Sequence, residues 1–156
     1  MESVKSNITP RATTWRLSIS ESKQFDNPTL YRSIVGALQY ATITRPDLAY
    51  SVNRVCQFMG NPLDQHWIVV KRILRYLQGT LSFGIHLKVV VSVSSLLITL
   101  TGLCDADWAT DPDDRKSVSG ACLFVGPNLV TWWSKKQQTV SRSSTEAEYI
   151  SLALAA

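Results

Sequence analysis

The sequence predicts an α+β fold, in which a helical first half is followed by a β-β-β-α unit. Apolar residues recur at helical spacing between residues 29 and 78. Beyond residue 82 they fall into short runs that are rich in β-branched side chains and bounded by turn residues. A helical pattern returns after Ser143. The chain of 156 residues is 45% hydrophobic and 18% charged, which is an ordinary globular composition.

Three helices are predicted in the first half, after a polar segment. Residues 1–28 show little periodicity, so we expect an extended polar arm. A helical region at 29–80 follows, with one helix ending near Pro46, a second at 47–59 and a third at about 64–78, where Gly79 is the expected C′ residue. Their apolar faces consist of Tyr31, Ile34, Val35, Leu38 and Ala41, then Leu48, Val52, Val55 and Phe58, and then Trp67, Val70, Ile73, Leu74 and Leu77.

The second half has strand character. Segments at 82–92 and 95–105 are expected strands, so a connector with strand character covers 81–99. Residues 118–125 and 129–134 form an expected hairpin around a turn at 126–128. Ser143 or Ser144 is the expected N-cap of the last helix.

Charge is distributed unevenly along the chain. Residues 1–80 carry ten Lys and Arg against five Asp and Glu, whereas 101–156 carry five against seven. A basic half beside an acidic half suits contact with a polyanion, although chance asymmetry on a solvated surface is the alternative.

The chain has features of an intracellular protein outside membranes. Cys56, Cys104 and Cys122 lack zinc-site spacing and are expected to be reduced thiols. The first residues lack the apolar core of a signal peptide, and the uncharged run at 89–103 is too short and too β-branched for a membrane helix.

Two pairs of carboxylates are the candidates for chemistry. Asp105 and Asp107 share a face of an expected strand, whereas Glu146 and Glu148 point in different directions on a helix. Ser143 and Glu146 fit a capping box, which leaves Glu148 as the expected ligand of Mg²⁺ or Mn²⁺ together with Asp105. A second capping box, from Thr145 to Glu148, also fits this pattern. The alternative to a metal site is that these acids are solvated residues of a turn and of a helix cap.

Long motifs carry a family resemblance. Residues 31–40 (YRSIVGALQY), 44–47 (TRPD) and 71–80 (KRILRYLQGT) resemble the C-terminal part of a Ty1/copia-type reverse transcriptase. Residues 104–109 (CDADWA), 132–138 (WWSKKQQ) and 141–149 (SRSSTEAEY) resemble the start of the ribonuclease H domain that follows it in the Pol polyprotein of these retrotransposons.

The resemblance implies a function and its limits. Asp105 and Glu148 match the first two catalytic acids of ribonuclease H, which hydrolyses RNA in RNA–DNA hybrids with two metal ions. The family's later acids are not among these residues, so the domain at 100–156 is expected to be truncated and inactive alone. No Y-x-D-D motif is present, so polymerase activity is not expected. The alternatives are a non-catalytic nucleic-acid-binding module and a decayed remnant without a selected role.

The expected partners are an RNA–DNA hybrid or another nucleic acid, and other Pol segments. Basic residues in the segment that resembles reverse transcriptase and in the segment that resembles ribonuclease H are the expected phosphate contacts. They are Arg45, Lys71, Arg72, Arg75, Lys135, Lys136 and Arg142. Asp111, Asp113 and Asp114 are expected in a solvated turn, and His66 and His86 as packing or surface residues.

Overall fold

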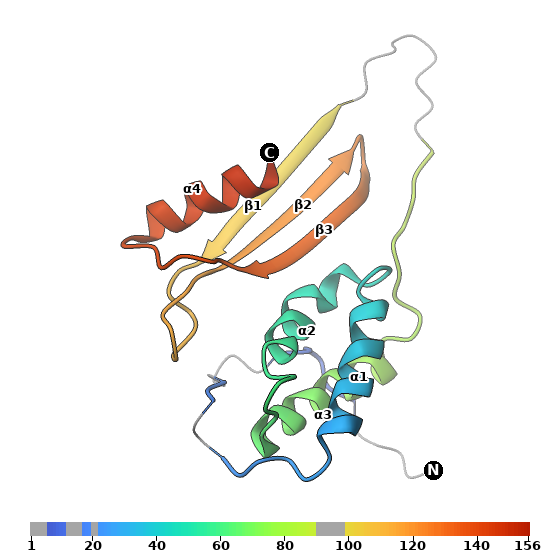
Figure 1. Cartoon of the computed structure of the whole chain (residues 1–156). Helices are drawn as coiled ribbons and strands as arrows, with labels where there is room; N and C mark the ends of the chain where they lie inside the picture. Colours follow the sequence, from blue (N-terminus) through green and yellow to red (C-terminus); the bar gives the residue numbers. More distant parts are fainter. Residues whose placement is uncertain (1–5, 12–16, 20–21, 90–98) are drawn as a thin grey trace. The chain divides into compact units, whose positions relative to one another are not determined.

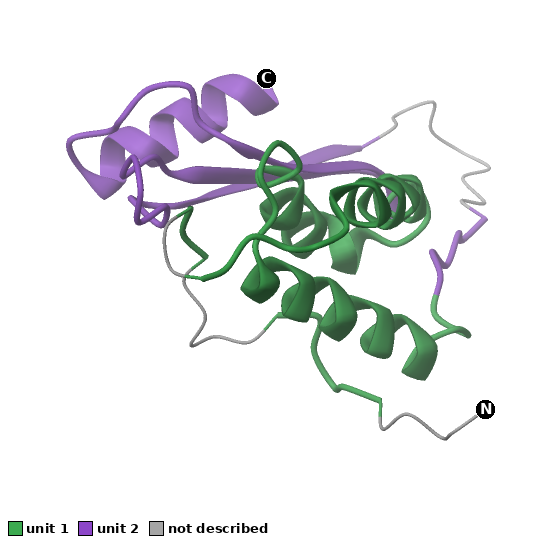
Figure 2. Ribbon diagram, turned by 60° about the horizontal axis from the view of Figure 1, so that its bottom comes forward, with its two compact units in different colours: residues 1–83 green, residues 84–156 purple. Residues whose placement is uncertain are grey.

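The computed structural model describes residues 6–11, 17–19, 22–89 and 99–156. The chain divides into two compact units, Met1–Phe83 and Gly84–Ala156 (Figure 2). The elements, in chain order, are α1 (Pro28–Ala41), the 3₁₀ helix η1 (Pro46–Leu48), α2 (Ala49–Cys56), α3 (Asp64–Gly79), β1 (Leu100–Asp107), β2 (Val118–Val125), β3 (Asn128–Lys136) and α4 (Ser144–Ala155) (Figure 1). The predicted α+β class is therefore confirmed. No helix within the described ranges is long and apolar enough to cross a membrane.

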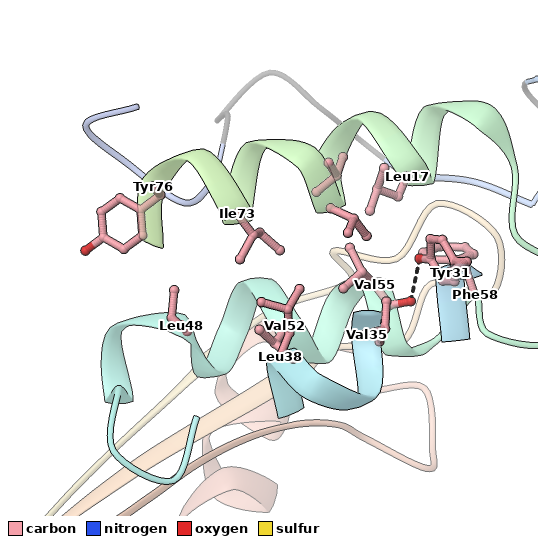
Figure 3. Packing of buried hydrophobic residues seen from close by; sticks show 12 residues of the cluster. Leu17, Tyr31, Val35, Leu38, Leu48, Val52, Val55, Phe58, Ile73 and Tyr76 are labelled. Atoms are coloured by element: carbon pink, nitrogen blue, oxygen red, sulfur yellow. Dashed lines mark hydrogen bonds between the residues drawn. The ribbon is translucent and has the colours of Figure 1, made fainter. Parts of the chain in front are cut away.

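The helices of the first unit enclose one hydrophobic core. Asn27 caps α1 by accepting a hydrogen bond from the Leu30 N–H at 3.0 Å, and Pro28 occupies the first turn. The buried faces of α1 and α2 are those that the periodicity predicted, and their side chains point toward α3 (Figure 3). The Tyr31 hydroxyl donates to the Val55 carbonyl at 2.8 Å, and burial raises the pKa of this hydroxyl.

The buried face of α3 includes the predicted Val70 and Ile73, and the predicted Trp67 and Leu77 pack against the core as partly buried residues. The buried face consists of His66, Val69, Val70, Ile73 and Tyr76. Leu74 is 37% exposed. The buried face is centred one residue earlier in the sequence than the apolar pattern indicated, so Leu74 lies outside it. His66 and Tyr76 belong to this face since each has a buried ring together with a polar atom that finds a partner.

The described N-terminal residues 6–11 contact α3 at two points. Ser6 packs against Gly79, where an added Cβ would lie 2.6 Å from the Ser6 Cβ. Further along the arm, the Thr9 hydroxyl accepts a hydrogen bond from Arg72 at 3.0 Å. Gly79 is the last helical residue rather than the expected C′ residue, so that prediction was wrong. Close approach of the arm requires a glycine there.

His66 joins the arm to the start of α3. Its Nδ1 accepts from the Leu63 N–H at 3.1 Å, and its Nε2 donates to the Ser18 carbonyl at 3.0 Å. The ring is fully buried and stacks on Phe58 with centroids 3.8 Å apart. Both ring nitrogens therefore have partners, as the prediction of a packing histidine requires.

The second unit contains a three-stranded antiparallel sheet in the order β1-β2-β3. β2 has the predicted bounds, whereas β3 begins at Asn128 and extends to Lys136, and β1 continues to Asp107. The turn between β2 and β3 is Gly126-Pro127, in which Gly126 has φ of 56°. α4 contacts β1 and β2.

The expected strand at 82–92 is not found in the described part of that segment. Residues 82–89 form no strand, and 90–92, like 95–98 of the next expected strand, lie outside the described residues. The Asn128 side chain instead binds the backbone of Lys88, accepting from its N–H at 2.6 Å and donating to its carbonyl at 2.9 Å. Leu87 and Val89 are exposed, so their apolar character did not indicate strand pairing.

Replacing His66 by Phe should destabilise the first unit by about 2–4 kcal/mol, because the Ser18 carbonyl and the Leu63 N–H would lose their buried partner. Urea unfolding followed by hydrogen exchange of peptides from residues 22–80 measures this loss. The matched control is His86→Phe, at an exposed position, for which no change is expected. Equal stabilities of the two variants would contradict the assigned role of His66.

Candidate functional site

The candidate carboxylates lie on β1 and α4. Asp105 and Asp107 pair with Gly120 and Val118 across the β1–β2 ladder, so they share one face of the sheet, as predicted. Glu148 follows the fully buried Ala147 on α4. Asp105, Asp107 and Glu148 are all exposed to solvent.

A hydrogen bond fixes α4 on β1 close to these acids. The Ser151 hydroxyl donates to the Asp105 carbonyl at 2.7 Å. Ser151 lies one helical turn after Glu148, so this contact places the Glu148 turn of α4 beside the last residues of β1. The structure therefore brings the segments that carry Asp105 and Glu148 together.

Ser143 has the capping role that the sequence predicted, whereas Glu146 binds a different backbone N–H from the predicted one. The Ser143 hydroxyl accepts from the Glu146 N–H at 3.1 Å, which identifies Ser143 as the N-cap. The Glu146 carboxylate accepts from the N–H of Arg142 at 2.7 Å, one residue before the cap, instead of from the cap itself. Glu146 is thus engaged at the start of α4, whereas Glu148 is exposed to solvent.

The sheet lies between the carboxylates of β1, Asp105 and Asp107, and the helix α4 that carries Glu148. Gln137 binds both Ser119 and α4, so the face of the sheet that carries Ser119 is the one that α4 covers. Strand alternation places the Asp105 and Asp107 side chains on the opposite face from Ser119. The hydrogen bond from Ser151 therefore joins α4 to the Asp105 backbone, and the carboxylates start on different sides of β1.

The described residues do not form a complete metal site. Within the described ranges, no group of three or more His, Cys, Asp and Glu side chains is placed to hold an ion. Mg²⁺ and Mn²⁺ take several oxygen ligands, and hydrolytic sites with two metal ions share carboxylates between the ions. Asp105 and Glu148 alone do not satisfy that requirement.

Gln137 was missed by the sequence analysis, although it organises the second unit. Its Nε2 donates to the Ser119 hydroxyl and to the Ala147 carbonyl, both at 2.9 Å, and its Oε1 accepts from the Ser141 hydroxyl at 3.0 Å. The side chain is only 3% exposed. A glutamine directly after a strand gives no sequence signal of burial, because glutamine is common on surfaces.

The loop between β1 and β2 is held by ion pairs. Asp111 is 2% exposed, and its carboxylate binds Lys136 at 2.7 Å. Lys136 also binds Asp114 at 2.9 Å. Burial lowers the pKa of Lys136, but the hydrogen bonds that Lys136 donates to these two acids, together with their negative charges, outweigh it, so the pKa is raised from its ordinary value. Asp111 is therefore buried rather than in the solvated turn that we expected.

The predicted phosphate-contact residues differ in their surroundings. Lys71, Arg75, Lys135 and Arg142 are exposed. Arg72 binds the arm through Thr9, and Lys136 is held by two acids. A role in nucleic-acid binding stays a prediction for all of them.

Arg45 is buried in a network of the first unit. Its guanidinium binds the Asp47 carboxylate at 3.0 and 2.7 Å and the Thr80 carbonyl and hydroxyl at 2.9 and 2.7 Å. It also lies over the rings of Tyr76 and Phe83, 5.7 Å from each centroid. Because Arg45 is only 6% exposed, these contacts favour a structural role over the predicted phosphate contact.

Asp47 is the acid of this network. The Tyr76 hydroxyl also donates to it, at 2.8 Å. Burial raises the pKa of Asp47, but hydrogen bonds from Arg45 and Tyr76 exceed that effect and hold the pKa below its ordinary value. The ionised form of Asp47 therefore stabilises the fold.

The chain is similar to retrotransposon proteins. It is 47% identical over 153 residues to the retrovirus-related Pol polyprotein from transposon RE2 of Arabidopsis thaliana, covering 98% of this chain and 10% of the relative. It is 44% identical over 125 residues to that from transposon TNT 1-94 of Nicotiana tabacum, covering 77% and 9%. The chain thus spans about a tenth of these curated relatives.

A short relative contains mostly the same segment. The secreted RxLR effector protein 161 of Plasmopara viticola is 44% identical over 123 residues, which cover 78% of this chain and 83% of the relative. No family model matches the chain. No solved structure matches it either.

The first unit should lose stability in acid because of Asp47. A carboxyl group whose pKa is lowered on folding stabilises the protein above its unfolded pKa of about 3.9, and this contribution disappears as the pH falls through the folded pKa. We expect Asp47→Asn to be less stable than the native chain at neutral pH, with a smaller further loss below about pH 4. Midpoints of urea unfolding, measured for both chains from neutral pH to below about pH 4, test this expectation. Asp26→Asn, in an exposed ion pair, should keep the native pH profile.

Gln137→Ala should destabilise the second unit by about 3 kcal/mol, since it leaves the Ala147 carbonyl and the Ser119 and Ser141 hydroxyls without their shared partner. Hydrogen exchange of α4 peptides, measured in a urea series, should show the loss. Gln138→Ala is the control, because Gln138 is exposed and adjacent in sequence. Unchanged protection of α4 in Gln137→Ala would contradict the assigned role.

Proposed function

Since the chain belongs to the family of retrovirus-related Pol polyproteins of transposons, we propose that its second unit is a ribonuclease H-like segment of a Ty1/copia-type Pol. In this proposal it contributes Asp105 and Glu148 to hydrolysis of the RNA strand in an RNA–DNA hybrid. The first unit is then the helical end of the reverse transcriptase. The substrate class follows from the family resemblance of the motifs around these two acids.

The docking of α4 on β1 is the observation that supports this proposal: it holds the Glu148 turn beside the end of β1, while the Asp105 carboxylate starts on the other side of the strand. The Ser151 hydroxyl and the Gln137 amide hold the helix at a fixed position along the strand. Glu146 is engaged in the helix cap, which leaves Glu148 exposed at the strand end. A preorganised acid on rigid secondary structure is what a hydrolytic site requires.

Asp105 and Glu148 need further ligands. We propose that other Pol segments supply the remaining carboxylates for Mg²⁺ or Mn²⁺, so that this chain provides one part of the site. A bound divalent ion would lower the pKa of a water molecule and stabilise charge on the leaving oxygen. The chain alone is then expected to bind these ions weakly, because each added carboxylate contributes to the affinity.

Binding of nucleic acid without catalysis is the second candidate. Exposed positive charges are found at Lys71 and Arg75 on α3, at Lys135 on β3 and at Arg142 just before α4. Such side chains bind phosphates independently of sequence and with strong salt dependence. A relative that contains little beyond this segment agrees with a role that needs no other part of Pol.

The two candidates differ in a cleavage assay with an RNA–DNA hybrid and Mn²⁺. We expect weak or no cleavage by the chain alone, and cleavage when a Pol segment carrying the missing acids is added. Asp105→Asn and Glu148→Gln should each reduce this cleavage by at least the roughly 10–100-fold that loss of an outer-shell partner of a metal ligand costs, because each removes an expected ion ligand. Glu146→Gln is the control, because it removes only a capping acid.

Full cleavage by the double variant Asp105→Asn/Glu148→Gln would disprove the hydrolytic proposal. Salt-sensitive hybrid binding that is lost in Lys71→Gln/Arg75→Gln, without cleavage under any of these conditions, would support the second candidate. Gln138→Ala is a charge-neutral change at an exposed position that is neither a candidate acid nor a candidate phosphate contact, so it should leave both readouts unchanged.

A further inference from the structure

Thr9 is an exposed threonine that is followed directly by a proline. It precedes Pro10, and no other of the six prolines in the chain follows a serine or threonine. The residue is exposed, and its neighbour Ile8 is 95% exposed. Residues 6–11 form no helix or strand, so they present the Thr9 hydroxyl on an accessible segment that a protein kinase could bind.

An arginine with spare hydrogen-bonding capacity lies beside the Thr9 hydroxyl. The Nη2 of Arg72 donates to Thr9 Oγ1 at 3.0 Å. The neighbouring Nε of Arg72 is buried and has no hydrogen-bond partner within the described part of the chain. Nε and Nη2 form one edge of the guanidinium group, and this edge matches two oxygens of a phosphate.

We propose that Thr9 is a phosphorylation site for a kinase that requires proline after the acceptor, and that Arg72 binds the resulting phosphate through its Nε–Nη2 edge. The γ-phosphoryl group of ATP is transferred to Thr9 Oγ1, ADP leaves, and the hydroxyl proton passes to a base of the kinase. The hydrogen bond from the hydroxyl to the Arg11 carbonyl, at 2.8 Å, is lost in this step. Two charge-assisted bonds to Arg72 replace it.

The phosphate would act on the arm and on the charge of α3. A second cation, Arg11, lies two residues further along the arm, where its guanidinium stacks on Tyr50 at 4.7 Å. Additional bonds between Thr9 and Arg72 would hold residues 6–11 more tightly on α3, beside the contact of Ser6 with Gly79. The same phosphate would neutralise part of the positive charge that α3 presents with Lys71 and Arg75.

The experiment treats the whole chain with ATP and a proline-directed serine/threonine kinase, and peptide mass spectrometry then locates the phosphoryl group. We expect one phosphoryl group on Thr9 in the native chain and none in Thr9→Val. Phosphorylation should slow hydrogen exchange of residues 6–11 by about tenfold or more, since a hydrogen bond to a charged group contributes at least this factor.

Variants of α3 separate the proposed contact from a general effect of charge. Arg72→Gln should still be phosphorylated on Thr9, but phosphorylation should no longer slow exchange of the arm. Arg75→Gln, one turn further along α3, should retain the full effect. The proposal is overturned if the folded native chain is not phosphorylated on Thr9, or if phosphorylation slows exchange equally in Arg72→Gln.

Discussion

The candidate site depends on the buried amide of Gln137. It joins the end of β3 to β2 through Ser119 and to α4 through the Ala147 carbonyl, and it also receives the Ser141 hydroxyl. Together with Ser151, it replaces much of the hydrophobic packing that normally fixes a helix on a sheet. Hydrogen bonds are directional, so those of Gln137 and Ser151 set the position of α4 along β1 as well as its contact with the sheet. Glu148 is exposed on the helix that is held in this position.

In the first unit, the arm and α3 depend on each other in a similar way. Apolar packing of α1, α2 and α3 forms the core, whereas polar contacts attach the arm. His66, Arg72 and Gly79 lie along α3 and receive Ser18, Thr9 and Ser6 of the arm. Arg72 differs from the other two because its side chain has an unused donor, and a ligand at that point would change how firmly the arm is attached. The described residues of the arm are thus part of the folded unit.

Net charge is a poor guide to which basic residues can meet a nucleic acid. Arg45 and Lys136 contribute to the positive charge of the sequence, but both bind acids of their own unit. Lys71, Arg75, Lys135 and Arg142 are exposed and keep their charge available to solvent. A phosphate contact must compete with any internal ion pair, so the exposed side chains are the stronger candidates.

The sequence by itself determined the α+β class, the buried faces of α1 and α2, the bounds of β2 and the Ser143 cap, because these depend on periodicity and on contacts between near neighbours. Motif spacing also identified Asp105 and Glu148 as the candidate acids. Only the tertiary structure decided that Gln137, Asp111 and Arg45 are buried, that Gly79 receives the arm, and that Asp105 and Asp107 lie on the sheet face opposite α4. Each of these features depends on a partner distant in the chain, and burial of a polar side chain is favourable only when that partner is in place.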